Sequence, residues 1–233
     1  MIRRSVVALA FVGLVALTGC EKVPPKTATP TPSASKNEWR ATAANVVEGR
    51  DYVAIKNGAP FEPEAGKIEV VEVFGYICPH CAHFEPLLTA WRAQQKDDVK
   101  FVTVPAPFGG WWMPYAKAYY AAKELDLADK THAAVFNAIH VEHSLPGEPA
   151  IATDAQIAQF YARYGADAAD FARRMESAPV AQKLRAADAF IERSGVDATP
   201  TMVVNGKYRV TGSSPEDTLR IVDALVARER TAH

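Results

Sequence analysis

The chain has little cysteine, no surplus of charge of either sign, and no hydrophobic run long enough to cross a membrane comfortably. Its 233 residues include three cysteines, 26 basic and 27 acidic side chains. Because the charges nearly balance, the chain lacks the excess of positive charge that is typical of nucleic-acid-binding proteins, so we expect no nucleic-acid partner. Hydrophobic residues make up 48% and charged residues 23%, which is ordinary for a soluble globular protein and excludes a chain that is disordered throughout.

The first twenty residues have the layout of a secretory signal. Arg3 and Arg4 precede an apolar run over residues 6–17, which is too short for a membrane-spanning helix. The run ends in LTGC, which resembles the lipobox of bacterial lipoproteins, where the cysteine carries lipid and becomes the mature N-terminus. We therefore expect a lipoprotein signal peptide over residues 1–19 and lipid on Cys20; a plain signal peptide with an incidental cysteine is the alternative.

The segment that follows cannot fold alone. It reads EKVPPKTATPTPSASKN and is rich in Pro, Thr, Ser and Ala but almost free of large apolar residues, which is typical of a tether. We expect residues 20–47 to be a lipidated N-terminus and flexible linker. Lipidation of Cys20 would also leave Cys78 and Cys81 as the only thiols of the mature protein.

A strand–helix–strand unit surrounds the two remaining cysteines. Residues 68–75 (IEVVEVFG) are apolar and β-branched, which predicts a buried strand. The following segment has apolar residues at helical spacing with Pro79 at a first helical position, and Pro86 predicts a kink. Residues 99–108 predict the second strand, so the cysteines lie where the first strand passes into the helix.

The rest of the chain predicts helices first and strands afterwards. The expected helices cover residues 114–125, 131–143, 153–165, 167–177 and 179–194, with a capping box beginning at Thr153. We expect them to form a helical layer of their own, and helices interspersed along one continuous sheet are the alternative. Asn205-Gly206 between TMVVN and KYRVTG predicts a hairpin. Ser214 and Pro215 predict the start of a last helix.

The pair Cys78-Pro79-His80-Cys81 can be a metal site, a structural staple or a redox pair. A zinc site needs four ligands and the pair supplies two; His83 could add a third, but His140 and His143 lie far along the chain. Covalent haem would need a histidine directly after the second cysteine. A permanent disulfide closing so short a loop constrains little chain entropy. We therefore expect no metal and no cofactor, and a redox-active pair in an oxidising compartment.

The position of the pair predicts different roles for the two thiols. Cys78 precedes the helix, where unpaired N–H groups and the helix dipole stabilise a thiolate. It should be the exposed, attacking sulfur, and Cys81, one turn in, the shielded resolving thiol. His80 between them can add positive charge or a hydrogen bond near the Cys78 sulfur, with a solvent-facing helix residue as the alternative. A stabilised thiolate makes the disulfide a stronger oxidant.

These motifs together resemble the DsbA family of periplasmic thiol:disulfide oxidoreductases. The resemblance covers roughly residues 48–230 and is most specific in FGYICPHCAHFEPLL and TPTMVVNGKY. It implies an α/β, thioredoxin-like fold with an inserted all-helical domain. Its first part would cover residues 48–110, the helical insertion 111–178, and the second part 179–233.

The resemblance also implies roles for residues outside the pair. Pro200 would be a cis-proline whose loop packs against the cysteines, and Thr199 would offer its backbone to a substrate strand. Glu72 matches a buried acid beneath the cysteines, a candidate proton acceptor for Cys81; an outward-facing Glu72 is the alternative. Trp111 and Trp112 either line a substrate groove or pack in the core.

The expected activity is donation of the Cys78–Cys81 disulfide, through a mixed disulfide at Cys78, to unfolded exported proteins with free thiols. A periplasmic isomerase or reductase, or less favourably a non-catalytic chaperone of the same fold, is the alternative. Two features depart from the best-known family oxidases. Thr199 replaces a valine, which leaves the redox poise open, and the lipid would keep the protein at a membrane, near a DsbB-like reoxidant.

Overall fold

The computed structural model describes residues 46–232. The expected signal peptide, Cys20 and nearly all of the expected linker therefore lie outside the described residues. Within this part of the chain, no helix is both long and apolar enough to span a bilayer.

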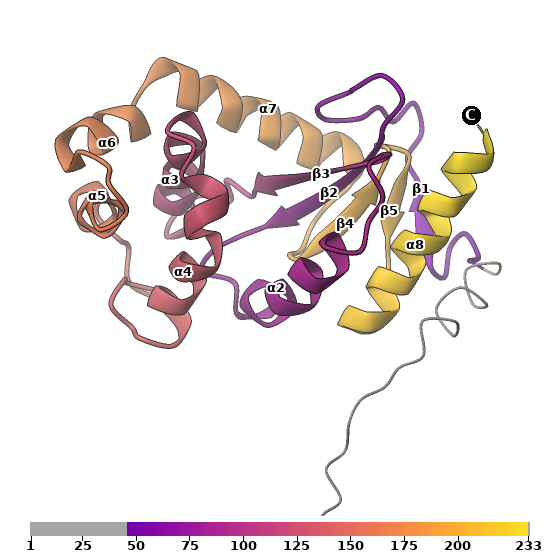
Figure 1. The fold of residues 1–233 in the computed structure, drawn as a ribbon, viewed down its shortest axis with the longest axis horizontal. Coiled ribbons are helices and arrows are strands. Elements are labelled where there is room, and N and C mark those ends of the chain that lie inside the picture. The colour runs from indigo at the N-terminus through magenta and orange to yellow at the C-terminus, as the bar shows by residue number, and fades with distance from the viewer. Residues whose placement is uncertain (1–45, 233) are drawn as a thin grey trace, which may run out of the picture. The chain divides into compact units, whose positions relative to one another are not determined.

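The described residues form a mixed five-stranded sheet covered by helices (Figure 1). The strands are β1 (Tyr52–Ala54), β2 (Ile68–Phe74), β3 (Val99–Pro105), β4 (Thr201–Val204) and β5 (Tyr208–Val210). Their order in the sheet is β1-β5-β4-β2-β3. β2 pairs parallel with β3, whereas the β2–β4, β4–β5 and β5–β1 pairs are antiparallel.

The elements follow one another in the predicted order. The helices are α2 (Pro79–Arg92), α3 (Trp112–Glu124), α4 (Ala128–His140), α5 (Asp154–Ala162), α6 (Ala168–Met175), α7 (Ala178–Ser194) and α8 (Pro215–Ala232). Among the described residues, five helices and no strand separate β3 from β4. Helices α3 to α6 gather beside the sheet, while α7 runs along it (Figure 1).

Local signals in the sequence explain several element ends. The Thr153 side chain and Gln156 form the predicted capping box at the start of α5. The Ser214 hydroxyl accepts a hydrogen bond from the Asp217 N–H at 3.1 Å, which caps α8. Both turn residues of the hairpin, Asn205 and Gly206, have positive φ, as a type I′ turn requires.

Some details differ from the sequence prediction. The second strand ends at Pro105 rather than residue 108. Helix α4 begins at Ala128, three residues before the predicted start, because its N-cap has no capping side chain to mark it. The short strand β1, which the sequence analysis missed, pairs with β5 at the far end of the chain. Helix α2 continues through Pro86, which agrees with the prediction that this proline does not stop the helix.

Two hydrophobic cores lie on opposite faces of the sheet. On one face, Val70 packs with residues of α2 and α8 such as Leu88 and Val222. On the other, Val71 and Val73 belong to a cluster that continues into α3 to α7. Alternate residues of β2 therefore point to opposite cores, which decides where Glu72 points.

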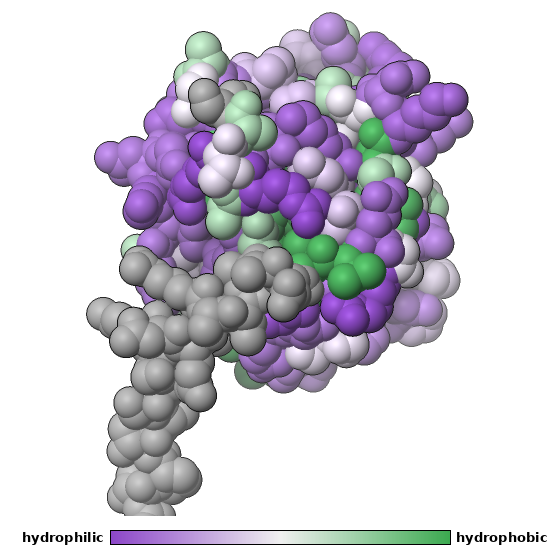
Figure 2. Space-filling model, turned by 90° about the vertical axis from the view of Figure 1, so that its right-hand side faces the viewer, coloured by the Kyte–Doolittle hydropathy of each residue, from purple (hydrophilic) through white to green (hydrophobic). Residues whose placement is uncertain are grey.

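The side of the molecule that carries β1 and α8 is mainly hydrophilic, with a limited hydrophobic area (Figure 2). Exposed hydrophobic side chains in and before β1 are Val47 and Val53, which are 48% and 38% exposed. Single exposed hydrophobic side chains of this kind are normal on a protein surface and need no explanation.

Candidate active site

The structure places the two cysteines at the N-terminus of α2, both as free thiols. Cys78 is the N-cap residue, with φ −77° and ψ 116°, and Pro79 is the first helical residue. Cys81 is fully buried, and Cys78 is 6% exposed. Cys78 is thus less exposed than predicted, because its sulfur lies against the Thr199 backbone and the residue belongs to the hydrophobic core.

The surroundings of Cys78 lower the pKa of its thiol to about 5. The largest cause is a hydrogen bond with the Cys81 side chain. The Thr199 side chain and the backbone of Cys81 and His80 act in the same direction, while burial opposes them. At neutral pH, Cys78 is therefore a thiolate, the form that attacks disulfides and leaves from them.

The surroundings of Cys81 act in the opposite sense. Burial, the hydrogen bond with Cys78 and the nearby Glu72 carboxyl group raise the pKa of the Cys81 thiol far above its usual range. The reduced pair therefore holds one thiolate and one thiol at neutral pH. This asymmetry gives the two sulfurs different chemistry although they are three residues apart.

Glu72 lies in the middle of β2 and faces α2, on the same side of the sheet as Val70. It is 1% exposed, so the outward-facing alternative is wrong. Burial, and then the charge of Glu85, raises the pKa of the Glu72 carboxyl group well above its usual range, while Arg92 opposes this. Its Oε2 atom has no hydrogen-bond partner within residues 46–232.

The histidines near the pair are exposed. His80 and His83 both lie on the outer side of α2, as does Pro79. Among the described residues, no hydrogen bond or ion pair is formed by the His80 side chain. Another group of polar side chains, Glu72, Glu85 and His132, does lie close together.

Thr199 and Pro200 lie beside Cys78, although 121 positions separate Thr199 from it in the chain. The peptide bond between them is cis. The Cys78 sulfur lies 3.4 Å from the Thr199 carbonyl oxygen, to which it can donate a hydrogen bond when protonated. Thr199 and Pro200 are both half-buried, so part of their surface remains accessible.

Aromatic side chains pack near the turn between β2 and α2. The Trp112 ring packs on Gly75, where an added Cβ would lie 2.1 Å from its nearest ring atom. The Phe108 and Trp112 ring centroids are 5.2 Å apart, and Phe108 is 43% exposed. Trp111 and Trp112 are half-buried and pack against the core, so core packing accounts for at least part of each ring.

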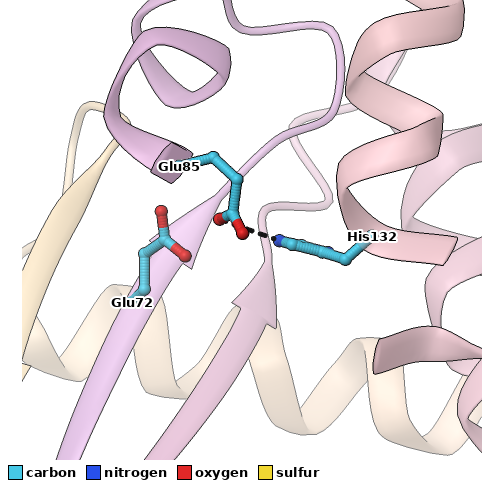
Figure 3. A group of neighbouring side chains, drawn as sticks. All are labelled: Glu72, Glu85 and His132. Carbon is cyan, nitrogen blue, oxygen red and sulfur yellow. Dashed lines mark ion pairs between the residues drawn. The ribbon is translucent and has the colours of Figure 1, made fainter. Parts of the chain in front are cut away.

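The sequence analysis missed Glu85 and His132. Their side chains meet between α2 and α4, with His132 Nε2 3.5 Å from Glu85 Oε2 (Figure 3). The Thr89 hydroxyl also donates to Glu85 at 2.7 Å. A signal for Glu85 was present, because it stands four residues after Cys81 on the inward face of the helix. No local signal marks His132, whose partners come from other elements.

Comparison with known proteins places these features in a family. Residues 69–222 match the model of the DSBA-like thioredoxin domain. The thiol:disulfide interchange protein DsbA of Pseudomonas aeruginosa is 37% identical over 195 residues, covering 82% of this chain and 90% of that protein. The protein of the same name from Azotobacter vinelandii is 36% identical over 192 residues, covering 81% of this chain and 87% of that protein.

Solved structures agree with the sequence comparison. The crystal structure of the oxidoreductase DsbA from Xylella fastidiosa has 50% identity and a TM-score of 0.77, covering 80% of this chain and 98% of that chain. The crystal structure of Pseudomonas aeruginosa DsbA has 37% identity and a TM-score of 0.71, covering 79% and 94%. The predicted fold, a thioredoxin-like fold with a helical insertion, is confirmed.

Proposed function

This chain belongs to the family of DsbA-like thioredoxin-domain proteins and is a thiol:disulfide oxidoreductase; we propose that it works as an oxidase, donating its Cys78–Cys81 disulfide to newly exported proteins. The observation that carries this direction is the asymmetry of the reduced pair. A pKa of about 5 at Cys78 stabilises the reduced form, and a stabilised reduced form makes the disulfide a stronger oxidant.

The proposed reaction begins at the Cys78 sulfur. A substrate thiolate attacks it, the Cys78–Cys81 bond breaks, and the electron pair of that bond remains on Cys81. A second substrate thiolate then attacks the substrate sulfur of the mixed disulfide, and Cys78 leaves as a thiolate. The substrate gains a disulfide, and the enzyme gains two electrons and, at Cys81, one proton.

That proton requires a donor because Cys81 is fully buried. We assign this role to Glu72, whose raised pKa keeps a proton on a carboxyl group that interacts with the Cys81 sulfur. A buried thiolate at Cys81 would have a high free energy, so proton transfer from Glu72 stabilises Cys81 as the leaving group. In the reverse direction, Glu72 would accept the proton.

Substrate would be held beside the pair by backbone contacts. Thr199 and Pro200 are half-buried and the Thr199 carbonyl oxygen lies next to the Cys78 sulfur, which supports the use of this segment as the docking edge for an extended substrate. The exposed Phe108 ring nearby offers an apolar surface to unfolded chains. Pro79 would begin the helix that carries the pair, and His80 would stabilise the Cys78 thiolate from the solvent side.

The proposed location is the periplasm, with the protein held at a membrane by lipid on Cys20. Support comes from the lipobox, from the linker composition of residues 20–47, and from relatives named as disulfide interchange proteins. At that membrane, a DsbB-like protein would reoxidise the pair. The proposed parts of the mature domain remain residues 48–110, 111–178 and 179–233.

Trapping of substrates tests the assignment of the two thiols. Cys81→Ala should leave a Cys78 that forms mixed disulfides with exported proteins but cannot release them from its own side. Such complexes should accumulate in cells and disappear on reduction, as seen on non-reducing gels. Cys78→Ala is the matched control and should trap nothing. Complexes that form with Cys78→Ala instead would reverse the roles.

Thr199 favours one alternative, an isomerase or reductase, because threonine at this position is more usual in those members of the fold. Equilibration of the pair with glutathione separates the two. An oxidase should be more oxidising than glutaredoxins, which lie at about −200 to −230 mV. A more reducing value would favour the alternative. Insulin reduction that is independent of Cys78 would point to a non-catalytic role.

A further inference from the structure

Three buried side chains from three elements meet in one cluster (Figure 3), and one of them, Glu72, acts on the Cys81 thiol. Glu72 comes from β2, Glu85 from α2 and His132 from α4. One carboxyl oxygen of each glutamate and one ring nitrogen of the histidine lie within 4.8 Å of one another. In Figure 3, the Glu85 carboxyl group lies between the other two side chains.

The cluster leads from the buried pair toward the surface. Glu72 is 1% exposed and its Oε2 lacks a partner within the described residues, whereas Glu85 and His132 are 7% and 8% exposed. Glu85 and His132 also line an open cleft of about 510 Å³ between α2 and α4, which Glu72 does not reach. Solvent therefore has access to the cluster from the His132 end.

Each ring nitrogen of His132 has a polar partner, so the orientation of the ring is fixed. Nε2 faces Glu85 Oε2 at 3.5 Å, and Nδ1 lies 2.8 Å from the Tyr76 hydroxyl oxygen. The pKa of Glu85 is held below its usual value because His132, Thr89 and Arg92 outweigh its burial. An ionised Glu85 in turn helps keep the proton on Glu72.

Other ionisable groups face the cluster from each element packed against it. They are Arg92 on α2, Asp129 on α4, Tyr76 in the turn after β2, Tyr119 on α3, Tyr161 on α5, and the two cysteines. The tyrosines stay neutral because burial raises their pKa values. Histidine side chains in general have an unperturbed pKa near neutral pH, so they can both accept and release a proton there.

We propose that Glu85 and His132 carry protons between Glu72 and the solvent in this cleft, which makes His132 a positioning residue of the redox reaction. The inference rests on the proposed function, because it supplies the step by which Glu72 is reset after each exchange with Cys81. Without such a path, the Glu72 carboxyl group, which is buried between the sheet and α2, could exchange its proton with solvent only when the protein opens locally.

The path is needed most when the reduced pair is reoxidised. The Cys78 thiolate first attacks a small disulfide, whose S–S bond breaks, so that one small thiolate leaves and a mixed disulfide remains at Cys78. The Glu72 proton then passes to Glu85, to His132 and to water. Cys81 gives its proton to the Glu72 carboxylate, and its thiolate attacks the Cys78 sulfur. The outer sulfur leaves with the electron pair of the broken bond. Over the two steps the Cys78–Cys81 disulfide forms, the small disulfide is reduced to two thiolates, and one proton reaches water.

The experiment follows these two steps separately. Reduced protein is mixed with oxidised glutathione, quenched with acid, and analysed by mass for the Cys78 mixed disulfide and the closed pair. His132→Gln should leave formation of the mixed disulfide within about two-fold of the wild type and slow its closure by at least ten-fold. General acid–base groups typically accelerate a reaction by a factor on the order of 10² to 10⁴. The rate of closure in the variant should increase with hydroxide concentration, whereas the rate in the wild type should level off as the pH rises.

Two controls separate proton transfer from packing. Tyr76→Phe removes the same hydrogen bond to His132 but keeps the imidazole, so closure should stay near the wild-type rate. His83→Gln removes an exposed histidine of α2 and should change neither step. If His132→Gln does not fold, Glu85→Gln interrupts the same path and should give the same slow closure.

Normal closure in the folded His132→Gln or Glu85→Gln protein would overturn the proton path. Equal slowing in Tyr76→Phe, with an unchanged pH profile, would also overturn it and leave a packing role. Failure of the wild type to form the mixed disulfide at all would instead count against the proposed function, so the two failures are distinguishable.

Discussion

Cys78 and Cys81 have the same side chain but opposite electrostatic surroundings. Cys78 caps a helix and collects hydrogen bonds that favour its thiolate, whereas Cys81 is enclosed and adjoins a carboxyl group. The Cys81 side chain contributes most to the low pKa of Cys78, and burial contributes most to the high pKa of Cys81. Position adds to this, because Cys78 precedes the first helical turn, where N–H groups are free, and Cys81 lies inside it. A single turn of helix therefore produces a nucleophile and a protonated partner.

The reduced protein should become more stable as the pH rises from about 5 to about 8.5. The folded-state pKa of Cys78 is about 5, and an ordinary thiol titrates at about 8.5. Because the folded-state pKa is lowered, the stabilisation is complete above the unfolded pKa and is lost as the pH falls through 5. Urea unfolding under reducing conditions, compared with Cys78→Ala, isolates this contribution. An equal pH dependence in both proteins would contradict it.

Thr199→Val should raise the pKa of Cys78 by up to about one unit. The side-chain hydrogen bond of Thr199 favours the thiolate, and a hydrogen bond to a charged group contributes about 1.5 kcal/mol, which corresponds to about one pKa unit. The disulfide should then become less oxidising, by about 30 mV for a tenfold change in equilibrium. Thiolate absorbance against pH measures the first effect and glutathione equilibration the second.

Thr199→Ser is the matched control for this change. It keeps the hydroxyl group and should keep the low pKa of Cys78. If valine and serine gave the same titration, the hydroxyl group would have no part in the pKa, and the backbone carbonyl would be the only contact of Thr199 that matters.

At the scale of single residues, the sequence predicted what depends on local chain order. The reactive position of Cys78 follows from a strand, a proline and a helix in succession. The burial of Glu72 could be predicted only in part, because apolar residues stand on both sides of it in the strand. His132 could not be predicted, because its contacts with Glu85 and Tyr76 join three separate elements.

The turn from β2 into α2 is shaped by close packing. Gly75 follows the strand, its carbonyl oxygen accepts the Cys78 N–H at 3.0 Å, and the Trp112 ring lies directly over it. Helix α3 thus presses on the segment that positions the reactive sulfur. The element that carries the pair and the first helix of the insertion are therefore coupled through one glycine.

Gly75→Ala should destabilise the protein by about 1–3 kcal/mol, the usual cost of overpacking. The new Cβ would lie 2.1 and 2.4 Å from two atoms of the Trp112 ring, so the ring or the turn must move. Urea unfolding measures the loss. The double variant Gly75→Ala with Trp112→Leu should lose less than the two single changes together, and simple additivity would show that the ring is not the obstacle.

Element types were more predictable than element pairing. Alternating and helical apolar patterns, the Thr153 capping box and the Asn-Gly turn each act within a few residues, so they are visible in the sequence. Strand β1 has three residues and its partners are Tyr208 to Val210, more than 150 positions later. Pairing over such a distance leaves no local pattern, which is why this edge strand was missed.

At the scale of the whole molecule, the residues of the redox site are separate in the sequence from the proposed site of lipid attachment. The cysteine pair, Glu72 and the Thr199–Pro200 segment all lie within the described domain, and their contacts come from α2, β2 and the start of β4. The lipobox and the linker precede that domain in the sequence. The DSBA-like match, residues 69–222, likewise excludes them. Attachment and redox chemistry should therefore be separable by mutation.

Cys20→Ser, made in the full-length chain, should release the protein from membranes without changing its redox chemistry. The mature N-terminus of the wild type should be a lipid-modified Cys20, and mass spectrometry tests this directly. Fractionation should move the variant to the soluble periplasmic extract, because one changed thiol removes the site of lipid attachment. Its glutathione equilibrium should equal that of the wild type, because none of the described contacts of Cys78 and Cys81 involves that segment. A mature wild-type N-terminus at another residue, or a Cys20→Ser protein that stays in the membrane fraction, would leave a plain signal peptide as the better interpretation. In that case the proximity to a membrane reoxidant would lose its physical basis.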